Sequence, residues 1–176
     1  MRILAISGSL RSQSANTAVV RAAVKLAPPG TDIAIYEGLA ALPHFNPDLD
    51  TEDPPEAVGA LRREVGRCNG ILICSPEYAH GVAGSLKNAL DWLVSSHEFP
   101  EKPVALINTS QRAVHAQAQL TEILRTMSAR LVDQSSITLP LWGRNLDAAG
   151  IASDPTLSSQ LRSSLDYFVS VLCQTT

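Results

Sequence analysis

The chain has 176 residues, 45% of them hydrophobic, which is enough to bury the core of one ordinary domain. Its net charge of −3 and its scattered Lys and Arg residues argue against a nucleic-acid partner. No apolar run approaches the ~20 residues that cross a bilayer and no secretory signal pattern follows Met1, so we expect one cytoplasmic domain over residues 1–176 without membrane contact.

The first predicted strand, Arg2–Ser7, leads through a polar turn into a predicted helix, Asn16–Leu26. The turn carries several hydroxyl groups, one glycine, the Asn16 amide and the guanidinium of Arg11. With the free N–H groups and positive dipole end of the helix, these groups suit a phosphate. Because triphosphate and dinucleotide glycine motifs are absent, a terminal monophosphate is favoured. The alternative is that Ser14 or Asn16 only caps the helix.

Four more strand and helix pairs follow along the chain. The predicted strands are Thr31–Tyr36, Gly70–Cys74, Pro103–Asn108 and Leu131–Leu139, and the predicted helices are Pro55–Arg67, Ala83–Ser96, Ala116–Arg130 and Pro155–Leu172. This alternation predicts a three-layer α/β fold of the flavodoxin-like type, a five-stranded parallel sheet in order 2-1-3-4-5 with helices on both faces. The last strand is the most polar and is expected at an edge. The last helix is the best marked, with Asp154 as its N-cap.

A second unusual segment, residues 75–84, follows the third predicted strand. Ligands of this fold bind between the carboxyl ends of strands 1 and 3, so this segment and the phosphate-type turn should face one crevice. Pro76 stiffens the segment, and Gly81 permits close approach to a flat ligand. Tyr78 offers an aromatic face, and Glu77 can accept hydrogen bonds. The alternative makes Glu77 a cap of the next helix and Tyr78 a surface packing residue.

Neither cysteine nor histidine spacing indicates a metal site. The three cysteines lack a C-x-x-C pair and are predicted to be buried free thiols: Cys68, Cys74 and Cys173. The four histidines show no ligand spacing such as H-E-x-x-H. Trp92 lies off the apolar stripe of its predicted helix, and we expect it in the core or at a subunit interface rather than against a ligand.

Three motifs together resemble the NADPH-dependent FMN reductases. They are Gly8-Ser9-Leu10-Arg11 with Ser14 and Asn16, then Ser75-Pro76-Glu77-Tyr78, then Leu86-Lys87-Asn88-Ala89-Leu90-Asp91-Trp92. The loop Leu42–Asp48 is also similar to that family's loop after strand 2, so the resemblance spans most of the chain. It implies a flavodoxin-like fold, bound FMN, and ping-pong hydride transfer from NADPH or NADH to a quinone, flavin, azo or metal-oxyanion acceptor. It also implies a homodimer or homotetramer with the flavin near a subunit interface.

The resemblance also assigns site residues by position. The expected phosphate contacts are Ser9, Arg11, Ser14, Asn16 and Thr17; the expected borders of the isoalloxazine ring are Pro76, Glu77, Tyr78 and Ala79, with Thr109 and Ser110 completing the pocket. His80 and Arg112 are the expected substrate contacts, although Arg112 is equally a solvated loop charge. The flavin carries the chemistry, so no catalytic side chain is expected beyond Tyr78 as a candidate for orienting substrate. Where many members have an Asn-Tyr-Ser run after the tyrosine, this chain has Ala79-His80-Gly81, so His80 is expected to change what stacks over the flavin.

Two further segments are candidates for covering the site. Residues 37–54 form a long connection, and loops of this length are often functional. Within it, Phe45 either covers a neighbouring subunit's site or packs on the surface. Residues 141–144 form a candidate lip in which Trp142 belongs to an interface or to the core.

Three other functions are considered. A flavin reductase could use FMN as a diffusible substrate, and a flavodoxin-like carrier or binding module would pass electrons without oxidising NAD(P)H. A carrier favours an acidic docking face, for which −3 is modest. A phosphotransferase would need a Lys and metal-binding acids, which the turn lacks.

Overall fold

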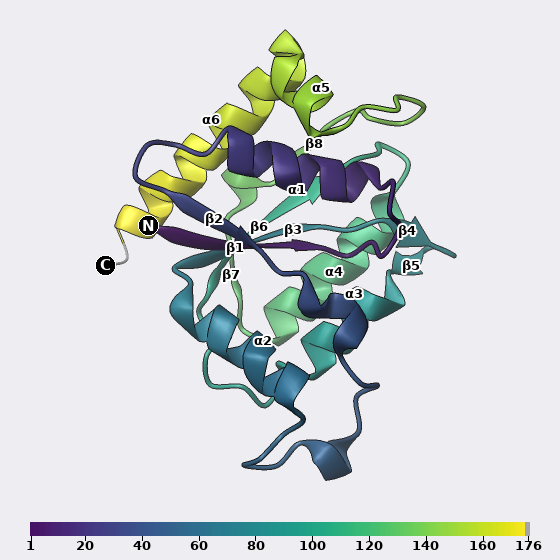
Figure 1. Ribbon diagram of the computed structural model, residues 1–176, viewed down its shortest axis with the longest axis vertical. Coiled ribbons are helices and arrows are strands. Elements are labelled where there is room, and N and C mark those ends of the chain that lie inside the picture. The colour runs from purple at the N-terminus through teal and green to yellow at the C-terminus, as the bar shows by residue number, and fades with distance from the viewer. Residues whose placement is uncertain (175–176) are drawn as a thin grey trace.

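A parallel β-sheet forms the centre of the protein in the computed structural model, which describes residues 1–174 (Figure 1). Its strands are β1 (Arg2–Ser7), β2 (Asp32–Ile35), β3 (Gly70–Cys74), β6 (Pro103–Asn108), β7 (Arg130–Leu131) and β8 (Ile137–Thr138). The order is β2-β1-β3-β6, and β7 and β8 both pair in parallel with β6 beyond it. This is the predicted flavodoxin-like order, with the fifth strand in two short pieces.

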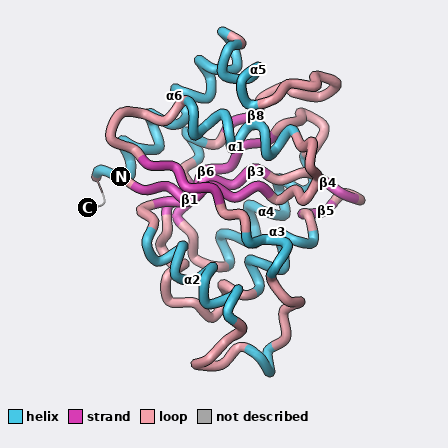
Figure 2. The backbone as a smooth tube through the Cα atoms, viewed as in Figure 1, coloured by secondary structure: helices cyan, strands magenta, loops and turns pink. Residues whose placement is uncertain are grey.

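Helices cover both faces of the sheet (Figures 1 and 2). They are α1 (Ala15–Lys25), α2 (Glu56–Arg67), α3 (Gly84–Asp91), α4 (Val114–Thr126), α5 (Ala148–Ser153) and α6 (Pro155–Cys173). Alternate residues of β1 serve the two layers: Ile3 and Ala5 pack in the cluster that includes α1 and α6, and Leu4 packs in the one that includes α2 and α3. Both faces of the central strands are therefore buried, as continuous apolar runs require.

The predicted strand Leu131–Leu139 is the element that the structure corrects most. A 3-10 turn, η3 (Asp133–Ser135), divides it into β7 and β8. The polar side chains explain the break, because the Ser136 hydroxyl accepts the Leu106 backbone N–H at 3.1 Å in place of a ladder partner. The segment lies at the sheet edge, as predicted.

Helix boundaries differ from the predicted ones where the backbone finds other partners. The helix predicted to run from Ala83 to Ser96 ends at Asp91, and the Arg62 guanidinium donates to the Trp92 carbonyl just beyond it at 2.8 Å. The helix predicted over 116–130 spans Val114–Thr126. The short helix α5 was not predicted; the Asp147 carboxylate caps it by accepting the Gly150 N–H at 2.7 Å.

Asp154 caps α6 as predicted, and the cap of α1 is Ser14, one of the two residues that the alternative interpretation of the first turn named. Ser14 is the N-cap of α1, and its hydroxyl accepts the Thr17 N–H at 3.4 Å. Asp154 caps α6 by accepting the N–H groups of Thr156 and Leu157, each at 3.0 Å. One apolar stripe of α6 is buried in the core cluster that includes Ile3 of β1; its residues are Leu157, Leu161, Leu165, Phe168 and Leu172.

Asn88 of α3 and Trp92 just beyond this helix hold the long connection over residues 37–54 in place. This connection contains two 3-10 turns, η1 (Gly38–Ala41) and η2 (Pro47–Leu49). The Pro43 carbonyl accepts from the Asn88 amide at 2.9 Å and from the Trp92 indole at 2.8 Å. Phe45 packs edge-to-face on Trp92 with ring centroids 5.0 Å apart. Trp92 is fully buried, which confirms its placement in the core.

Two cysteines are buried free thiols as predicted, Cys68 and Cys74, but Cys173 is exposed. Cys173 ends α6, and its neighbour Leu172 occupies the helix face that meets the sheet. No helix within residues 1–174 is both long enough and apolar enough to span a bilayer.

Candidate functional site

A cleft of about 1150 Å³ lies at the carboxyl ends of the central strands. Four segments line it: the turn after β1 with α1, the segment after β3, the turn after β6, and residues 141–149. Of the thirteen predicted site residues, twelve line this cleft: Ser9, Arg11, Ser14, Asn16, Thr17, Pro76, Glu77, Tyr78, His80, Thr109, Ser110 and Arg112. Ala79 does not line it.

The turns after β1 and β3 touch, and a glycine permits this contact. The Gly8 N–H donates to the Cys74 carbonyl at 2.9 Å, and the Ser85 hydroxyl donates to the Gly8 carbonyl at 3.1 Å. A Cβ built on Gly8 would lie 2.9 Å from the Ser75 Cβ, so any larger residue would force the two turns apart. The absence of a side chain at Gly8 therefore brings the two predicted ligand-binding segments together.

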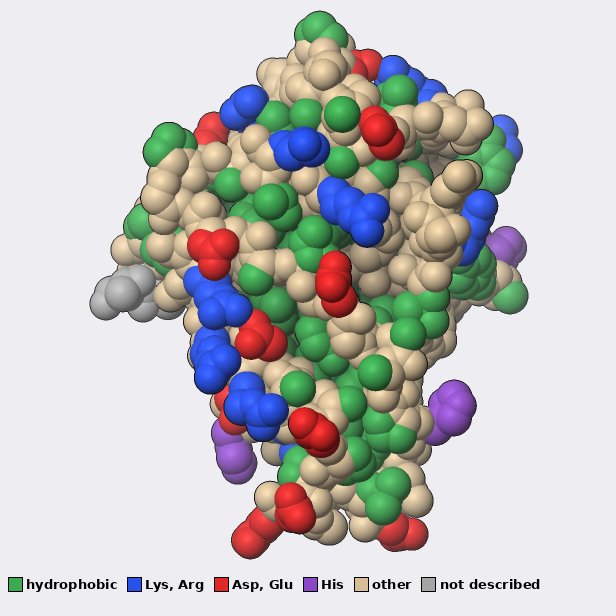
Figure 3. Space-filling view, viewed as in Figure 1, with side chains coloured by type: hydrophobic (Ala, Val, Ile, Leu, Met, Phe, Trp, Pro, Cys, Tyr) green, Lys and Arg blue, Asp and Glu red, His purple; other side chains and the backbone are tan. Residues whose placement is uncertain are grey.

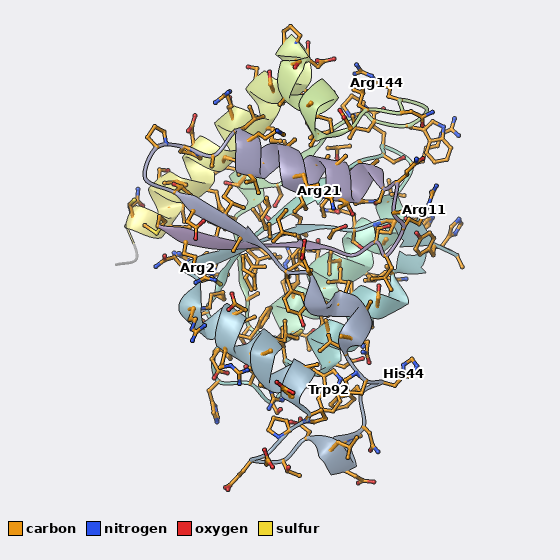
Figure 4. All side chains as sticks on the ribbon, viewed as in Figure 1. Arg2, Arg11, Arg21, His44, Trp92 and Arg144 are labelled. Carbon is orange, nitrogen blue, oxygen red and sulfur yellow. The ribbon has the colours of Figure 1, made fainter. Side chains whose placement is uncertain are left out.

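Hydroxyl groups order the turn after β1 from within. The Ser7 and Thr17 hydroxyls are hydrogen-bonded at 2.8 Å, and the Ser9 hydroxyl accepts the Arg11 N–H at 3.4 Å. The Arg11 side chain is exposed and forms no ion pair with any residue from 1 to 174 (Figure 4). The turn thus presents an unpaired guanidinium beside the amino end of α1, an arrangement suited to a phosphate.

Asn16 is buried, and its carbonyl oxygen connects three segments. It accepts from the Cys74 thiol and from the Thr109 hydroxyl, both at 3.3 Å. Burial raises the pKa of the Cys74 thiol, which therefore keeps its proton and acts as a donor. Because the carbonyl oxygen is occupied in this way, the Asn16 amide –NH₂ is the part of the side chain that can face a ligand.

The segment after β3 is a small β-hairpin that the sequence did not predict. Its strands are β4 (Glu77–Tyr78) and β5 (Gly81–Val82), which pair antiparallel. The two turn residues, Ala79 and His80, have φ values of 49° and 59°. Such a two-residue turn is usually built with Asn and Gly, so its sequence signal is absent here. Ala79 therefore belongs to the turn of the hairpin and not to the cleft wall.

Contacts with α4 hold this hairpin in position. A carboxylate oxygen of Glu77 accepts the Ala116 N–H at 2.8 Å, so Glu77 does cap a helix, but this helix is α4 rather than the next helix, α3. The Gln119 amide donates to the His80 carbonyl at 3.1 Å. The His80 ring stacks on His115, with centroids 4.3 Å apart and planes 12° apart. The hairpin is thus fixed to α4 by one capping carboxylate, one amide and one ring pair.

Side chains of the turn after β6 also order its backbone through local hydrogen bonds. The side-chain oxygen of Asn108 accepts the Ser110 N–H at 3.0 Å, and the Ser110 hydroxyl accepts the Arg112 N–H at 3.1 Å. The Arg112 guanidinium lies over the Trp142 ring, 5.2 Å from its centroid. Trp142 is 69% exposed, so of the two alternatives given for it, a core position is wrong and an interface position stays a prediction.

Three basic side chains that line the cleft were not predicted as cofactor or substrate contacts: Arg21 and Lys25 of α1, and Arg144. Arg21 and Lys25 are four residues apart, a spacing that puts them on one helix face. In the sequence, this four-residue spacing in the helix after the phosphate-type turn is the signal that could have identified Arg21 and Lys25 as site residues. Within residues 1–174, no group of three or more His, Cys, Asp or Glu side chains is placed to hold a metal ion.

Comparisons with known proteins identify the family of the chain. A family model described as NADPH-dependent FMN reductase matches residues 1–143. An NAD(P)H-dependent FMN reductase of Pseudomonas aeruginosa is 32% identical over 155 residues, which cover 85% of this chain and 83% of that protein. A quinone reductase of Escherichia coli is 32% identical over 143 residues, covering 76% and 74%. The solved structure of FerB, a flavoenzyme NAD(P)H:(acceptor) oxidoreductase from Paracoccus denitrificans, superposes with a TM-score of 0.80 at 27% identity and covers 98% of this chain and 97% of its own. The chain therefore belongs to the NADPH-dependent FMN reductase family.

Proposed function

We propose that this protein is an FMN-dependent NAD(P)H oxidoreductase that passes hydride through bound FMN to a small-molecule acceptor, namely a quinone, a flavin, an azo compound or a metal oxyanion. Family membership and the relatives that are FMN and quinone reductases support this function. The observation that carries it is the single cleft in which a phosphate-type turn and a stiff hairpin meet at the switch point of the sheet.

The donor set at the start of α1 fits the FMN phosphate. Arg11 is exposed and without an ion pair among the described residues, and Ser14 and Thr17 line the cleft at the helix start. A dianionic phosphate would gain charged hydrogen bonds from the guanidinium and hydroxyls, and the helix dipole favours it there. Ser9 and the Asn16 amide complete the group of residues that would bind it.

The flavin ring would lie between the hairpin and the turn after β6. Pro76 and Tyr78 line one side of this part of the cleft, and Thr109 and Ser110 line another. When bound, FMN supplies the hydride chemistry, and the protein orients the ring and excludes water. Glu77 acts here through α4, because its carboxylate holds the hairpin at the helix start. Tyr78 is 52% exposed, and both Tyr78 and His80 line the cleft, so these two side chains would meet an incoming acceptor.

The shared cleft supports a ping-pong order in which NAD(P)H leaves before the acceptor enters. Apolar side chains on the segments that border the cleft are exposed: Leu10, Tyr78, Val114 and Trp142. We propose that a second copy of the chain covers them in a homodimer or homotetramer. A cytoplasmic location would supply the NAD(P)H that the reaction consumes.

The visible spectrum of the purified protein tests this function. We expect a yellow protein whose flavin absorbance bleaches on anaerobic addition of NADPH and returns with a quinone. A colourless protein that gains no flavin spectrum with added FMN would refute the proposal. A protein that binds FMN but does not oxidise NADPH would instead be an electron carrier. Arg11→Ala should weaken FMN binding about tenfold or more, whereas unchanged affinity would remove Arg11 from the phosphate site.

A further inference from the structure

The cleft extends along α1 beyond the turn that suits the FMN phosphate. We call this extension the distal arm; Arg21 and Lys25 of α1 line one side of it, and residues 144–149 line the other. Single-ligand pockets measure about 300–1,000 Å³, and this cleft exceeds that range. The cleft therefore has room for more than the flavin.

The charge of the cleft is opposite to that of the whole protein. Its lining contains five cationic side chains and two carboxylates, whereas the chain carries a net charge of −3. Both carboxylates are engaged at helix starts: Glu77 accepts from Ala116 at 2.8 Å, and Asp147 accepts from Gly150 at 2.7 Å. The excess of positive charge thus faces the cleft and favours an anionic ligand.

Two of the five cations have no assigned partner. Arg112 lies over Trp142, and Arg144 pairs with Asp154 at 2.7 Å. Arg11 belongs to the proposed FMN phosphate site. Within residues 1–174, the exposed side chains of Arg21 and Lys25 form neither an ion pair nor a hydrogen bond. Figure 3 shows Lys and Arg side chains over α1, and Figure 4 shows Arg21 on this helix with Arg144 on the nearby loop.

The length of α1 separates Lys25 from the FMN phosphate. Arg21 and Lys25 follow the N-cap Ser14 by seven and eleven residues, which corresponds to about 10 Å and about 16 Å along the helix axis. One phosphate at the helix start cannot contact Ser14 and Lys25 together over that length. The distal arm therefore suits a second anionic group, carried by a different ligand.

We propose that the distal arm binds the 2′-phosphate of NADPH, and that Arg21 and Lys25 make the enzyme prefer NADPH to NADH. This inference rests on the proposed function, in which the nicotinamide end of the dinucleotide must reach the flavin. NADPH differs from NADH by one phosphate on its adenosine end, and a guanidinium with a nearby ammonium group binds such a phosphate. The exposed ring of Trp142, in the wall next to the arm, offers a flat face for adenine.

Steady-state kinetics of the holoenzyme test the proposal with the double variant Arg21→Ala/Lys25→Ala. We expect kcat/KM for NADPH to fall about tenfold to a hundredfold through KM, with kcat/KM for NADH changed less than about threefold. A matched control is Arg63→Ala/Arg162→Ala, which removes two exposed cations of other helices that do not line the cleft. The control should keep the wild-type preference between the two dinucleotides.

Calorimetry with 2′-AMP and 5′-AMP gives a readout independent of turnover. The wild-type holoenzyme should bind 2′-AMP more tightly than 5′-AMP, and the Arg21→Ala/Lys25→Ala variant should lose that difference. The 2′-phosphate assignment would be overturned if the Arg21→Ala/Lys25→Ala variant lost kcat/KM equally with NADPH and NADH, or if it kept the wild-type ratio of the two kcat/KM values. Either result would leave the proposed function intact. A wild-type protein that binds FMN but oxidises neither dinucleotide would overturn the proposed function itself.

Discussion

Glu77 is predicted to act on protein stability rather than directly on FMN affinity. Its carboxylate accepts the Ala116 N–H at 2.8 Å in the first turn of α4. Glu77→Ala removes a hydrogen bond to a charged group and the interaction of that charge with the helix dipole. Loss of a helix cap costs about 0.5–2 kcal/mol, so we expect the free energy of unfolding to fall by about 1–2 kcal/mol. For a chain of this size, that loss corresponds to a drop in Tm of about 2–8 °C.

Glu77→Gln is the matched variant, because the amide keeps an oxygen that can accept the Ala116 N–H but carries no charge. We expect it to lose about 0.3–1 kcal/mol, the part due to the helix dipole. Urea unfolding of the FMN-free protein measures both losses without a contribution from the cofactor. Titration with FMN then measures affinity. If FMN affinity fell more than tenfold in both variants while the free energy of unfolding did not change, Glu77 would contact the flavin and the capping assignment would be wrong.

Three further predictions follow from single contacts. Gly8→Ala should lower both the free energy of unfolding and FMN affinity, because the added Cβ collides with the segment after β3. The control is Gly84→Ala, where a Cβ meets no atom within 4 Å; it should leave both quantities nearly unchanged. Hydrogen bonds from Ser95 and Arg62 lower the pKa of the Asp50 carboxyl in the folded protein. The ionised carboxylate therefore stabilises the fold at pH values above its unfolded-state pKa. This contribution disappears as the pH falls through the lower folded-state pKa. Asp50→Asn should therefore cost about 1 kcal/mol in urea unfolding at pH 7. The cost should shrink as the pH falls below the unfolded-state pKa, and a loss that stays the same in acid would contradict this assignment. Ala79→Asn should raise the free energy of unfolding by about 0.5–1 kcal/mol because its φ of 49° suits Asn better, and a lower Tm would argue against that reasoning.

Much of the fold was predictable because its signals are local. Strands β3 and β6 are continuous apolar runs, and their observed bounds are the predicted ones. The start of α6 was equally clear, since Asp154 and Pro155 are the residue types that begin a helix. The segment 131–139 was less predictable, because a serine hydroxyl there replaces backbone pairing with β6.

The site was predictable in its residue types but not in the partners of its side chains. Asn16 was predicted from its position after a phosphate-type turn, and it does line the cleft. Its side-chain carbonyl oxygen, however, accepts hydrogen bonds from Cys74 and Thr109, which lie 58 and 93 residues away. The four-residue spacing of Arg21 and Lys25 was a weak signal, because ordinary exposed helix charges show it too. The position of residues 141–149 makes that helix face one wall of a cleft.

The sequence by itself determined the order of strands and helices, the phosphate-type turn, and the family resemblance, since each depends on periodicity, caps and short motifs within neighbouring residues. Tertiary structure decided that Glu77 accepts a hydrogen bond from α4, that His80 stacks on His115, and that the cleft continues along α1. These features depend on residues that are distant in the chain and meet only when the helices pack on the sheet. Local sequence patterns carry no information on which side chains those will be.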